Sequence, residues 1–180
     1  MAEDIFQRRI DPYSSSSSSS SPSSSSLPSQ IRCLPEAVLG HIFGFIEEAC
    51  DRSSISLVCK EWYSVDRKTR KSIASCYSIK PSRLTNRFES LAAVKIKGKP
   101  RATMFRLCPD DWGGHAEPWI SEISKHCSSI VSVHLRRMIV TDKDLTSLSA
   151  RPGNLLQVLK LEKCSGFSTR GLEAIARSCG

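Results

Sequence analysis

The chain has 180 residues, of which 39% are hydrophobic, and a formal net charge of +8 at pH 7. This length allows one or two small domains, and the apolar content is sufficient for a core. No apolar run approaches the ~20 residues of a membrane-spanning helix, and the mixed-charge N-terminus lacks the apolar segment of a secretory signal. We therefore expect neither a membrane protein nor a secreted one.

The reactive residue types are scattered along the chain. None of the eight cysteines lies in a Cys-x-x-Cys pair, so neither a zinc site nor a thioredoxin-type centre is indicated. Several cysteines occupy apolar helical positions, where a reduced thiol behaves as a small hydrophobic group, and this favours the cytosol or the nucleus. The four histidines are dispersed, and no Walker A motif is present. We therefore expect a non-catalytic protein that holds no metal.

The positive charge is concentrated in one segment. Residues 60–106 contain 13 Lys/Arg and 3 Asp/Glu, a net charge of +10, whereas the rest of the chain contains 13 and 15, a net charge of −2. A local positive field of this size attracts nucleic acid, an anionic membrane or a polyphosphate.

A Ser-rich leader occupies residues 1–31, with serine runs at 14–21 and 23–26. A segment of this composition cannot bury enough apolar surface to offset its chain entropy, so we predict that it is disordered. Ordered structure is expected to begin near Leu34-Pro35, since proline suits the first turn of a helix.

Three short helices are predicted over residues 32–75. Apolar residues of the first follow helical spacing, and they are Val38, Leu39, Ile42, Phe43 and Ile46. Asp51 is expected to cap the second helix, whose apolar residues are Ile55, Val58, Cys59 and Trp62. The third is expected to run through Val65 and Thr69 to Ile73. A core this small is weak on its own, so the module needs a partner or an abutting domain.

Residues 76–180 repeat a strand pattern. Short alternating strands are predicted at 91–96, 130–135 and 156–161, and the third fits the template Leu-x-x-Leu-x-Leu-x-x-Cys of leucine-rich repeats. The wider spacing between the first two strands predicts an inserted loop at 97–118.

Helices are expected between these strands, one beginning at Pro118 and others capped by Thr141 and Ser168. The predicted fold class is therefore α/β: a small all-α three-helix module, followed by the first repeats of a solenoid with its strands on the concave face. About three repeats are the minimum for a stable stack, so the chain resembles the front part of a longer protein.

A basic cluster is predicted on the concave face. Lys95 and Lys97 alternate with apolar residues, so both point to one side of the sheet. Lys97 and Arg136 occupy equivalent places on strands expected to lie about 4.8 Å apart, which makes them near neighbours. Arginine and lysine bind phosphate well. The cluster is therefore either a candidate anion site or a set of solvated surface cations.

The segment LPEAVLGHIFGFIEEACDRSSISLVCKEWYSVDRKTRK, beginning at Leu34, resembles an F-box. The opening Leu-Pro pair, the apolar first helix and the Leu-Val-Cys run before Trp62 carry this resemblance. It implies docking onto a Skp-type adaptor of a cullin-RING ubiquitin ligase. The residues expected at that contact are Leu34, Pro35, Val38, Leu39, Ile42 and Phe43.

Four further blocks follow in order: KGKPRATMFRL at 97–107, DDWGGHAEPW at 110–119, HLRRMIVTDKDL at 134–145 and LEKCSGFSTRGL at 161–172. Together they resemble the F-box, leucine-rich-repeat plant hormone receptors. Lys-Pro-Arg-Ala followed by Met-Phe is closer to the coronatine-insensitive jasmonate receptors than to the auxin receptors.

This resemblance implies two sets of site residues. The expected hormone-binding residues are Arg101, Met104, Phe105 and Leu107. The expected ligands of an inositol polyphosphate cofactor are Lys97, Arg101, Arg136 and Arg137. It also implies a nuclear protein that is the substrate-recognition subunit of a ubiquitin ligase of the SCF type. Such a protein binds a jasmonoyl amino-acid conjugate together with the degron peptide of a transcriptional repressor, and catalyses nothing itself.

Two alternatives stay open. One is an auxin-type F-box receptor. The other is a non-enzymatic basic protein that binds nucleic acid or acts as a scaffold through residues 60–106, which strong salt dependence would reveal. The favoured hypothesis, a jasmonate-type F-box receptor, includes neither a nucleic-acid partner nor a membrane partner.

Overall fold

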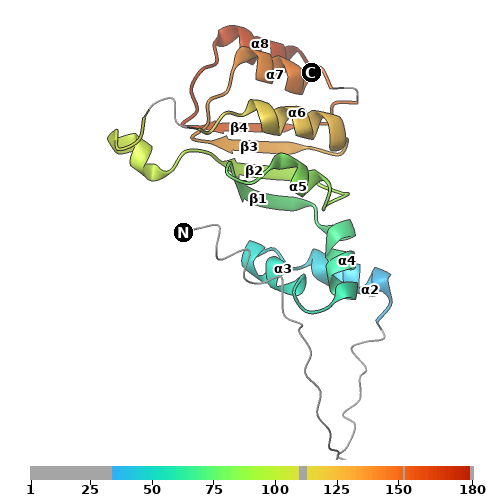
Figure 1. Cartoon of the computed structure of the whole chain (residues 1–180). Helices are drawn as coiled ribbons and strands as arrows, with labels where there is room; N and C mark the ends of the chain where they lie inside the picture. Colours follow the sequence, from blue (N-terminus) through green and yellow to red (C-terminus); the bar gives the residue numbers. More distant parts are fainter. Residues whose placement is uncertain (1–33, 110–112, 152, 179–180) are drawn as a thin grey trace, which may run out of the picture. The chain divides into compact units, whose positions relative to one another are not determined.

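The computed structural model describes residues 34–109, 113–151 and 153–178 (Figure 1). These residues belong to one compact unit, Leu34–Gly180. The predicted leader at 1–31 lies outside the described residues, and so does the side chain of Met104. Among the described residues, no helix combines the length and the apolar character needed to cross a membrane.

Helices form the first part of the described chain. The first predicted helix is confirmed as α2 (Glu36–Gly44), which buries Leu39 and Phe43. The prediction of a single second helix is wrong, because two helices occupy that stretch, α3 (Ala49–Ile55) and α4 (Lys60–Thr69).

The break between these two helices has a local cause. Glu48 is the N-cap of α3, and Asp51, the expected cap, lies inside the helix. The sulfur of Cys59 starts α4 by accepting a hydrogen bond from the Trp62 N–H at 3.5 Å. As a result, Val58 lies between the helices with 60% of its surface exposed.

The third predicted helix ends at Thr69, and its expected extension to Ile73 is wrong. Ile73 lies instead in β1 (Ser72–Cys76), in register with Val94 of the next strand. A short helix, α5 (Pro81–Thr85), follows, and neither β1 nor α5 is among the predictions. Strand pairing and packing against the larger core therefore override the helical spacing of this short basic run.

The repeat region, residues 72–178, contains a parallel four-stranded sheet in the order β1-β2-β3-β4. The three predicted strands are confirmed, each starting two residues later than expected: β2 (Ala93–Lys97), β3 (Ser132–Arg136) and β4 (Val158–Glu162). Helices alternate with them: α6 (Glu117–His126), α7 (Asp142–Ser149) and α8 (Thr169–Ser178). Figure 1 shows α6, α7 and α8 stacked in the same order as the strands. This alternation is consistent with the early leucine-rich repeats expected from the sequence.

The predicted helix starts are also confirmed. Pro118 lies in the first turn of α6. The Thr141 hydroxyl accepts a hydrogen bond from the Asp144 N–H at 3.3 Å, and the Asp144 carboxylate accepts one from the Thr141 N–H at 2.8 Å, which forms a capping box. Before α8, the Ser168 hydroxyl accepts a hydrogen bond from the Arg170 N–H at 3.2 Å.

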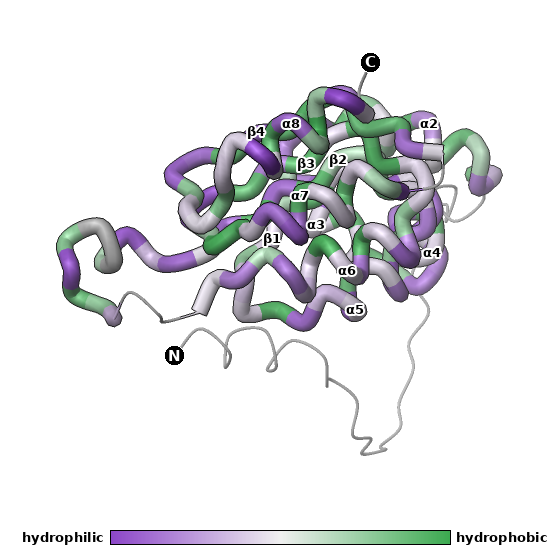
Figure 2. The backbone as a smooth tube through the Cα atoms, turned by 90° about the horizontal axis from the view of Figure 1, so that it is seen from above, coloured by the Kyte–Doolittle hydropathy of each residue, from purple (hydrophilic) through white to green (hydrophobic). Residues whose placement is uncertain are grey.

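The start of the inserted loop depends on a glycine. The Gly98 N–H donates to the Arg136 carbonyl at 2.7 Å, and a Cβ on Gly98 would lie 2.2 Å from the Arg137 carbonyl oxygen. No other residue fits this approach without moving the backbone. A 3-10 helix, η2 (Arg101–Phe105), follows. Figure 2 shows this loop extending away from the strands, with hydrophobic and hydrophilic residues mixed along it.

Candidate functional site

The outward residues of the strands form what we call the basic face. On β2 and β3 the alternate residues Val94, Ile96, Val133 and Leu135 are buried, and Leu159 and Leu161 of β4 are partly buried. The residues between them have ionisable side chains: Lys95, Lys97, His134, Arg136, Lys160 and Glu162. Parallel pairing aligns these charges in rows across the sheet, since each strand sits in register with the next.

The predicted neighbours Lys97 and Arg136 are brought together. They are direct register partners on β2 and β3, and Glu162 of β4 is the next partner in that row. The Nε of Arg136 lies 2.9 Å from one carboxylate oxygen of Glu162, and the Nε2 of His134 lies 3.3 Å from the other. Glu162 is not among the site residues predicted from the sequence, although its place after Leu161 matches that of Arg136 after Leu135.

Arg137 has a different environment from Arg136. It leaves β3 in the left-handed region, with φ of 54°, and its Nε donates to the Lys99 carbonyl at 2.7 Å. The Lys99 N–H donates back to the Arg137 carbonyl at 2.8 Å. Arg137 therefore holds the start of the inserted loop against the end of β3.

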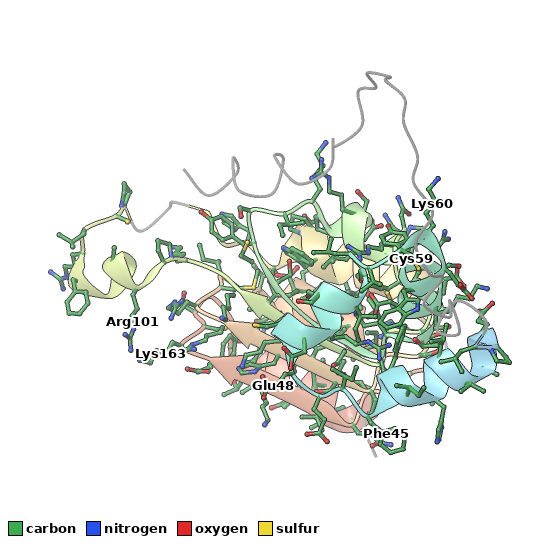
Figure 3. All side chains as sticks on the ribbon, turned by 90° about the horizontal axis from the view of Figure 1, so that it is seen from below. Phe45, Glu48, Cys59, Lys60, Arg101 and Lys163 are labelled. Carbon is green, nitrogen blue, oxygen red and sulfur yellow. The ribbon has the colours of Figure 1, made fainter. Side chains whose placement is uncertain are left out.

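Lys163 was also missed by the sequence reading. It follows β4 as Arg137 follows β3, and its φ of 55° is nearly the same. The sequence carries a cue, because each residue directly follows the last residue of a strand, at equivalent positions of two repeats. Figure 3 shows the Arg101 side chain extending from the loop toward the side on which Lys163 lies.

The inserted loop exposes apolar residues beside cations. Phe105 is 72% exposed and Leu107 is 75% exposed, and Arg101 is exposed on the same 3-10 helix as Phe105. The Leu107 N–H donates to the Ala102 carbonyl at 3.1 Å, which closes the turn. The predicted hormone-binding residues with described side chains therefore lie on one short segment, open to solvent.

A second apolar surface lies on α2. Val38 and Ile42 are 42% and 44% exposed, and Phe45, just after the helix, is 73% exposed. Their spacing of four and then three residues places them on one side of the helix. Leu39 and Phe43, also expected at the adaptor contact, are each only 1% exposed, because they form the core beneath this surface. We call Val38, Ile42 and Phe45 the α2 surface.

The remaining predicted adaptor residues and two further apolar side chains lie at the same end of the chain. Pro35 is exposed and Leu34 is partly buried against the helical core. Leu57 and Val58, which the sequence reading did not select, are 66% and 60% exposed in the turn before α4. Apolar side chains exposed to this extent are typical of a protein contact.

Two thiols of the repeat region are poor nucleophiles. Burial raises the pKa of both Cys127 and Cys164 above the usual range of a cysteine. The Cys164 thiol donates to the Leu135 carbonyl at 3.4 Å. Both side chains therefore serve packing between neighbouring repeats.

Comparison with known families matches two parts of the chain. Residues 32–72 match the F-box model, and residues 89–135 match the model described as the Transport inhibitor response 1 protein domain. The first match covers α2, α3 and α4, and the second covers β2, the inserted loop and most of β3.

Individual relatives extend the similarity across both parts. The chain is 45% identical over 148 residues to coronatine-insensitive protein homolog 1b of Oryza sativa subsp. japonica, covering 81% of this chain and 25% of that protein. It is 46% identical over 144 residues to coronatine-insensitive protein 1 of Arabidopsis thaliana, covering 79% and 24%. GRR1-like protein 1 of Arabidopsis thaliana is 43% identical over 147 residues, covering 81% and 25%.

The chain thus spans about a quarter of the length of the curated relatives that it matches. It contains segments that match the F-box and the Transport inhibitor response 1 protein domain, and over 79% to 81% of its length it is similar to the coronatine-insensitive proteins.

Proposed function

We propose that this chain recruits substrates to an SCF-type ubiquitin ligase, with its F-box docked on a Skp-type adaptor and through it on a cullin. The observation that carries this proposal is the F-box match over residues 32–72 together with the exposed α2 surface. The helical core below that surface has few members, so covering its apolar neighbours with a partner adds buried area that the module lacks alone.

The substrate side of the proposal is a jasmonate co-receptor that binds a transcriptional repressor. Its support is the identity of 45% to 46% with coronatine-insensitive proteins and the pairing of a cation with apolar residues on the inserted loop. The Arg101 guanidinium suits the carboxylate of a jasmonoyl amino-acid conjugate. Phe105 and Leu107 suit its hydrocarbon part.

The basic face is proposed to hold an inositol polyphosphate. Lys97 and Arg136 lie in register on adjacent strands, and Arg137 ties the loop that carries Arg101 to the same sheet edge. Several phosphate groups on one ring could engage these cations together, and each contact would be charge-assisted.

Adaptor docking is tested by co-expression. The chain should co-purify with a Skp-type adaptor, and Phe45→Glu or Ile42→Glu should abolish the complex, because each places a charge within the α2 surface. Leu172→Glu is a matched control, since Leu172 is 44% exposed on α8, in the repeat region. Equal adaptor binding by the F-box variants and the control would contradict the proposed surface.

Anion binding is tested by thermal unfolding with inositol hexakisphosphate. A ligand that binds only the folded state raises the melting temperature, and the double change Arg136→Ala with Arg137→Ala should remove this rise. Lys143→Ala is the control, because Lys143 is exposed on α7, away from the strands. An unchanged rise in the double variant would place the anion elsewhere.

Hormone binding is expected to need more than the inserted loop. A small ligand usually buries most of its surface in its site, and the described residues provide only one exposed segment. We expect no measurable affinity of this chain for a jasmonate–isoleucine conjugate, measured by calorimetry with or without the repressor peptide. Binding at micromolar concentration would show that the loop is sufficient.

A further inference from the structure

Glu162 has an unusual place on the basic face. Among the outward-facing residues of the four described strands it is the sole carboxylate, and it ends the row that runs from Cys76 through Lys97 and Arg136. The remaining ionisable members of the face are lysine and histidine. A single negative charge therefore sits at the end of the proposed anion site.

This carboxylate is already engaged by two groups on β3. One oxygen lies 2.9 Å from Nε of Arg136 and the other lies 3.3 Å from Nε2 of His134. It thus lies beside the Arg136 guanidinium as an ion-pair partner, although the buried Nε–H of Arg136 makes no hydrogen bond among the described residues. An anion that is to bind Arg136 must displace the carboxylate or share the guanidinium with it.

The displacement is feasible but has a cost. The Glu162 side chain is 40% exposed, whereas Arg136 is 29% exposed and His134 is 20% exposed. The carboxylate can therefore rotate into water, while the Arg136 and His134 side chains stay against the sheet. A single phosphate that displaces the carboxylate gains little binding free energy, because the new contact replaces an existing one.

A ligand with several adjacent phosphates gains more contacts than it loses. It loses the same contact to Glu162 but also reaches Lys97, which is the register partner of Arg136 on the opposite side from Glu162. The number of new contacts grows with the number of phosphates, whereas the competing charge stays at one. Discrimination of this kind comes from a repulsive element within the site as much as from attraction.

We infer that Glu162 sets a charge threshold on the basic face: it keeps single phosphates and carboxylates off Arg136 and is displaced by polyphosphates. This rests on the proposed anion site and names the residue that makes that site selective. Glu162 is a specificity-determining residue in this account, and its effect is on the ratio of affinities for different anions.

The experiment is a charge series on the 180-residue chain. Orthophosphate, pyrophosphate, tripolyphosphate and inositol hexakisphosphate are titrated at one pH and constant ionic strength, and melting temperature and calorimetric affinity are recorded. The wild-type chain should respond to the last two and not to orthophosphate. In Glu162→Gln, orthophosphate and pyrophosphate should bind about two- to fivefold more tightly, the size of one lost charge contact in a partly exposed site.

Two further variants keep the outcome clear. Glu173→Gln is the matched control, because Glu173 forms an exposed ion pair with Arg177 on α8 at 3.5 Å. It should leave the whole series unchanged. Glu162→Asp retains the charge but shortens the side chain, so it should show a threshold between those of the wild type and Glu162→Gln.

The outcomes separate this inference from the anion site itself. If the wild type binds inositol hexakisphosphate and Glu162→Gln improves all four ligands equally, or none, the threshold is overturned while the site stands. If neither the wild type nor Glu162→Gln responds to any ligand, the basic face is not an anion site and the inference falls with it.

Discussion

The F-box helices and the repeat region are stabilised in different ways. Among the described residues, seventeen buried apolar residues form the core cluster of the repeat region, and four form that of the F-box helices: Leu39, Phe43, Ile55 and Val65. The smaller core is supplemented by buried charge. Asp66 is fully buried, and Arg52 and Arg70 beside it are 7% and 6% exposed.

This buried network joins all three F-box helices. The Asp66 carboxylate accepts hydrogen bonds from Nε of Arg52 at 2.8 Å, from a terminal nitrogen of Arg70 at 2.9 Å and from the Ser56 hydroxyl at 2.6 Å. Arg52 on α3 also donates to the Phe43 carbonyl on α2. One carboxylate therefore organises contacts that a larger domain would make with apolar side chains.

The network continues to the repeat region. The Arg70 guanidinium lies 5.1 Å from the centre of the Phe88 ring, and that of Arg87 lies 4.8 Å from the same ring. Phe88 belongs to the core cluster of the repeats. The comparison teaches that a connected network of buried charge supplements a small apolar core in the F-box helices. The repeat region, which also buries Lys99, Asp144 and Arg151, has the larger apolar cluster.

The largest expected effect comes from removing the central carboxylate. Asp66→Asn leaves Arg52 and Arg70 buried without a compensating charge, which should destabilise the F-box helices by roughly 3–5 kcal/mol. Urea unfolding followed by circular dichroism should show early loss of helix before the sheet unfolds. Glu36→Gln is the control, because its ion pair with Lys68 at 2.7 Å is exposed, and it should cost about 0–1 kcal/mol. Equal effects of the two changes would contradict the central role of Asp66.

A change in the repeat core tests the other side of the comparison. Leu135 is fully buried on β3, so Leu135→Ala should cost about 2–5 kcal/mol through lost apolar contact and a cavity. Its cost should not depend on pH between neutrality and mild acid, since no titrating group is removed. A strong pH dependence of that cost would show that charge also supports the repeats. Leu107→Ala, at a residue 75% exposed on the loop, is the control that should stay within about 0.5 kcal/mol.

The two regions also differ in how far their structure could be predicted from sequence. The strands of the repeat region were predictable because Val94 and Ile96 alternate with lysines, a period that only a strand satisfies. The same period, carried to the next repeat, placed Lys97 beside Arg136. The break before α4 was not predictable from spacing, since Val58 continues the helical pattern of Ile55 and is nevertheless exposed.

The candidate site shows the same limit at the level of side chains. The register of the strands could be predicted from the pattern, but the ion-pair partner of Arg136 could not. That partner is the neighbour that carries the opposite charge and lies within reach, which is Glu162 and not Lys97. Glu162 lies in the third repeat, and its contact with Arg136 spans two strands that are separated by α7. Contacts of this kind require the relative placement of the repeats, which no single motif contains.

The smallest expected effect is a difference in acid sensitivity between the two regions. Burial alone would raise the pKa of the Asp66 carboxyl, but hydrogen bonds from Arg70 and Ser56 and the charges of Arg70 and Arg52 outweigh it and hold the pKa below its ordinary value of 3.8. A lowered pKa in the folded state contributes stability that is fully present above the ordinary value and is lost as the pH falls through the folded value. The F-box helices should therefore weaken below about pH 4, while the apolar repeat core changes less. The effect is smaller than that of Asp66→Asn, because the lowered pKa leaves most Asp66 carboxylates ionised over most of the acid range.

Hydrogen exchange measured from pH 7 downward, with rates corrected for intrinsic acid dependence, should show protection lost first in α3 and α4. Loss of protection in β3 and α7 before α4 would show that the repeats, and not the Asp66 network, limit stability in acid.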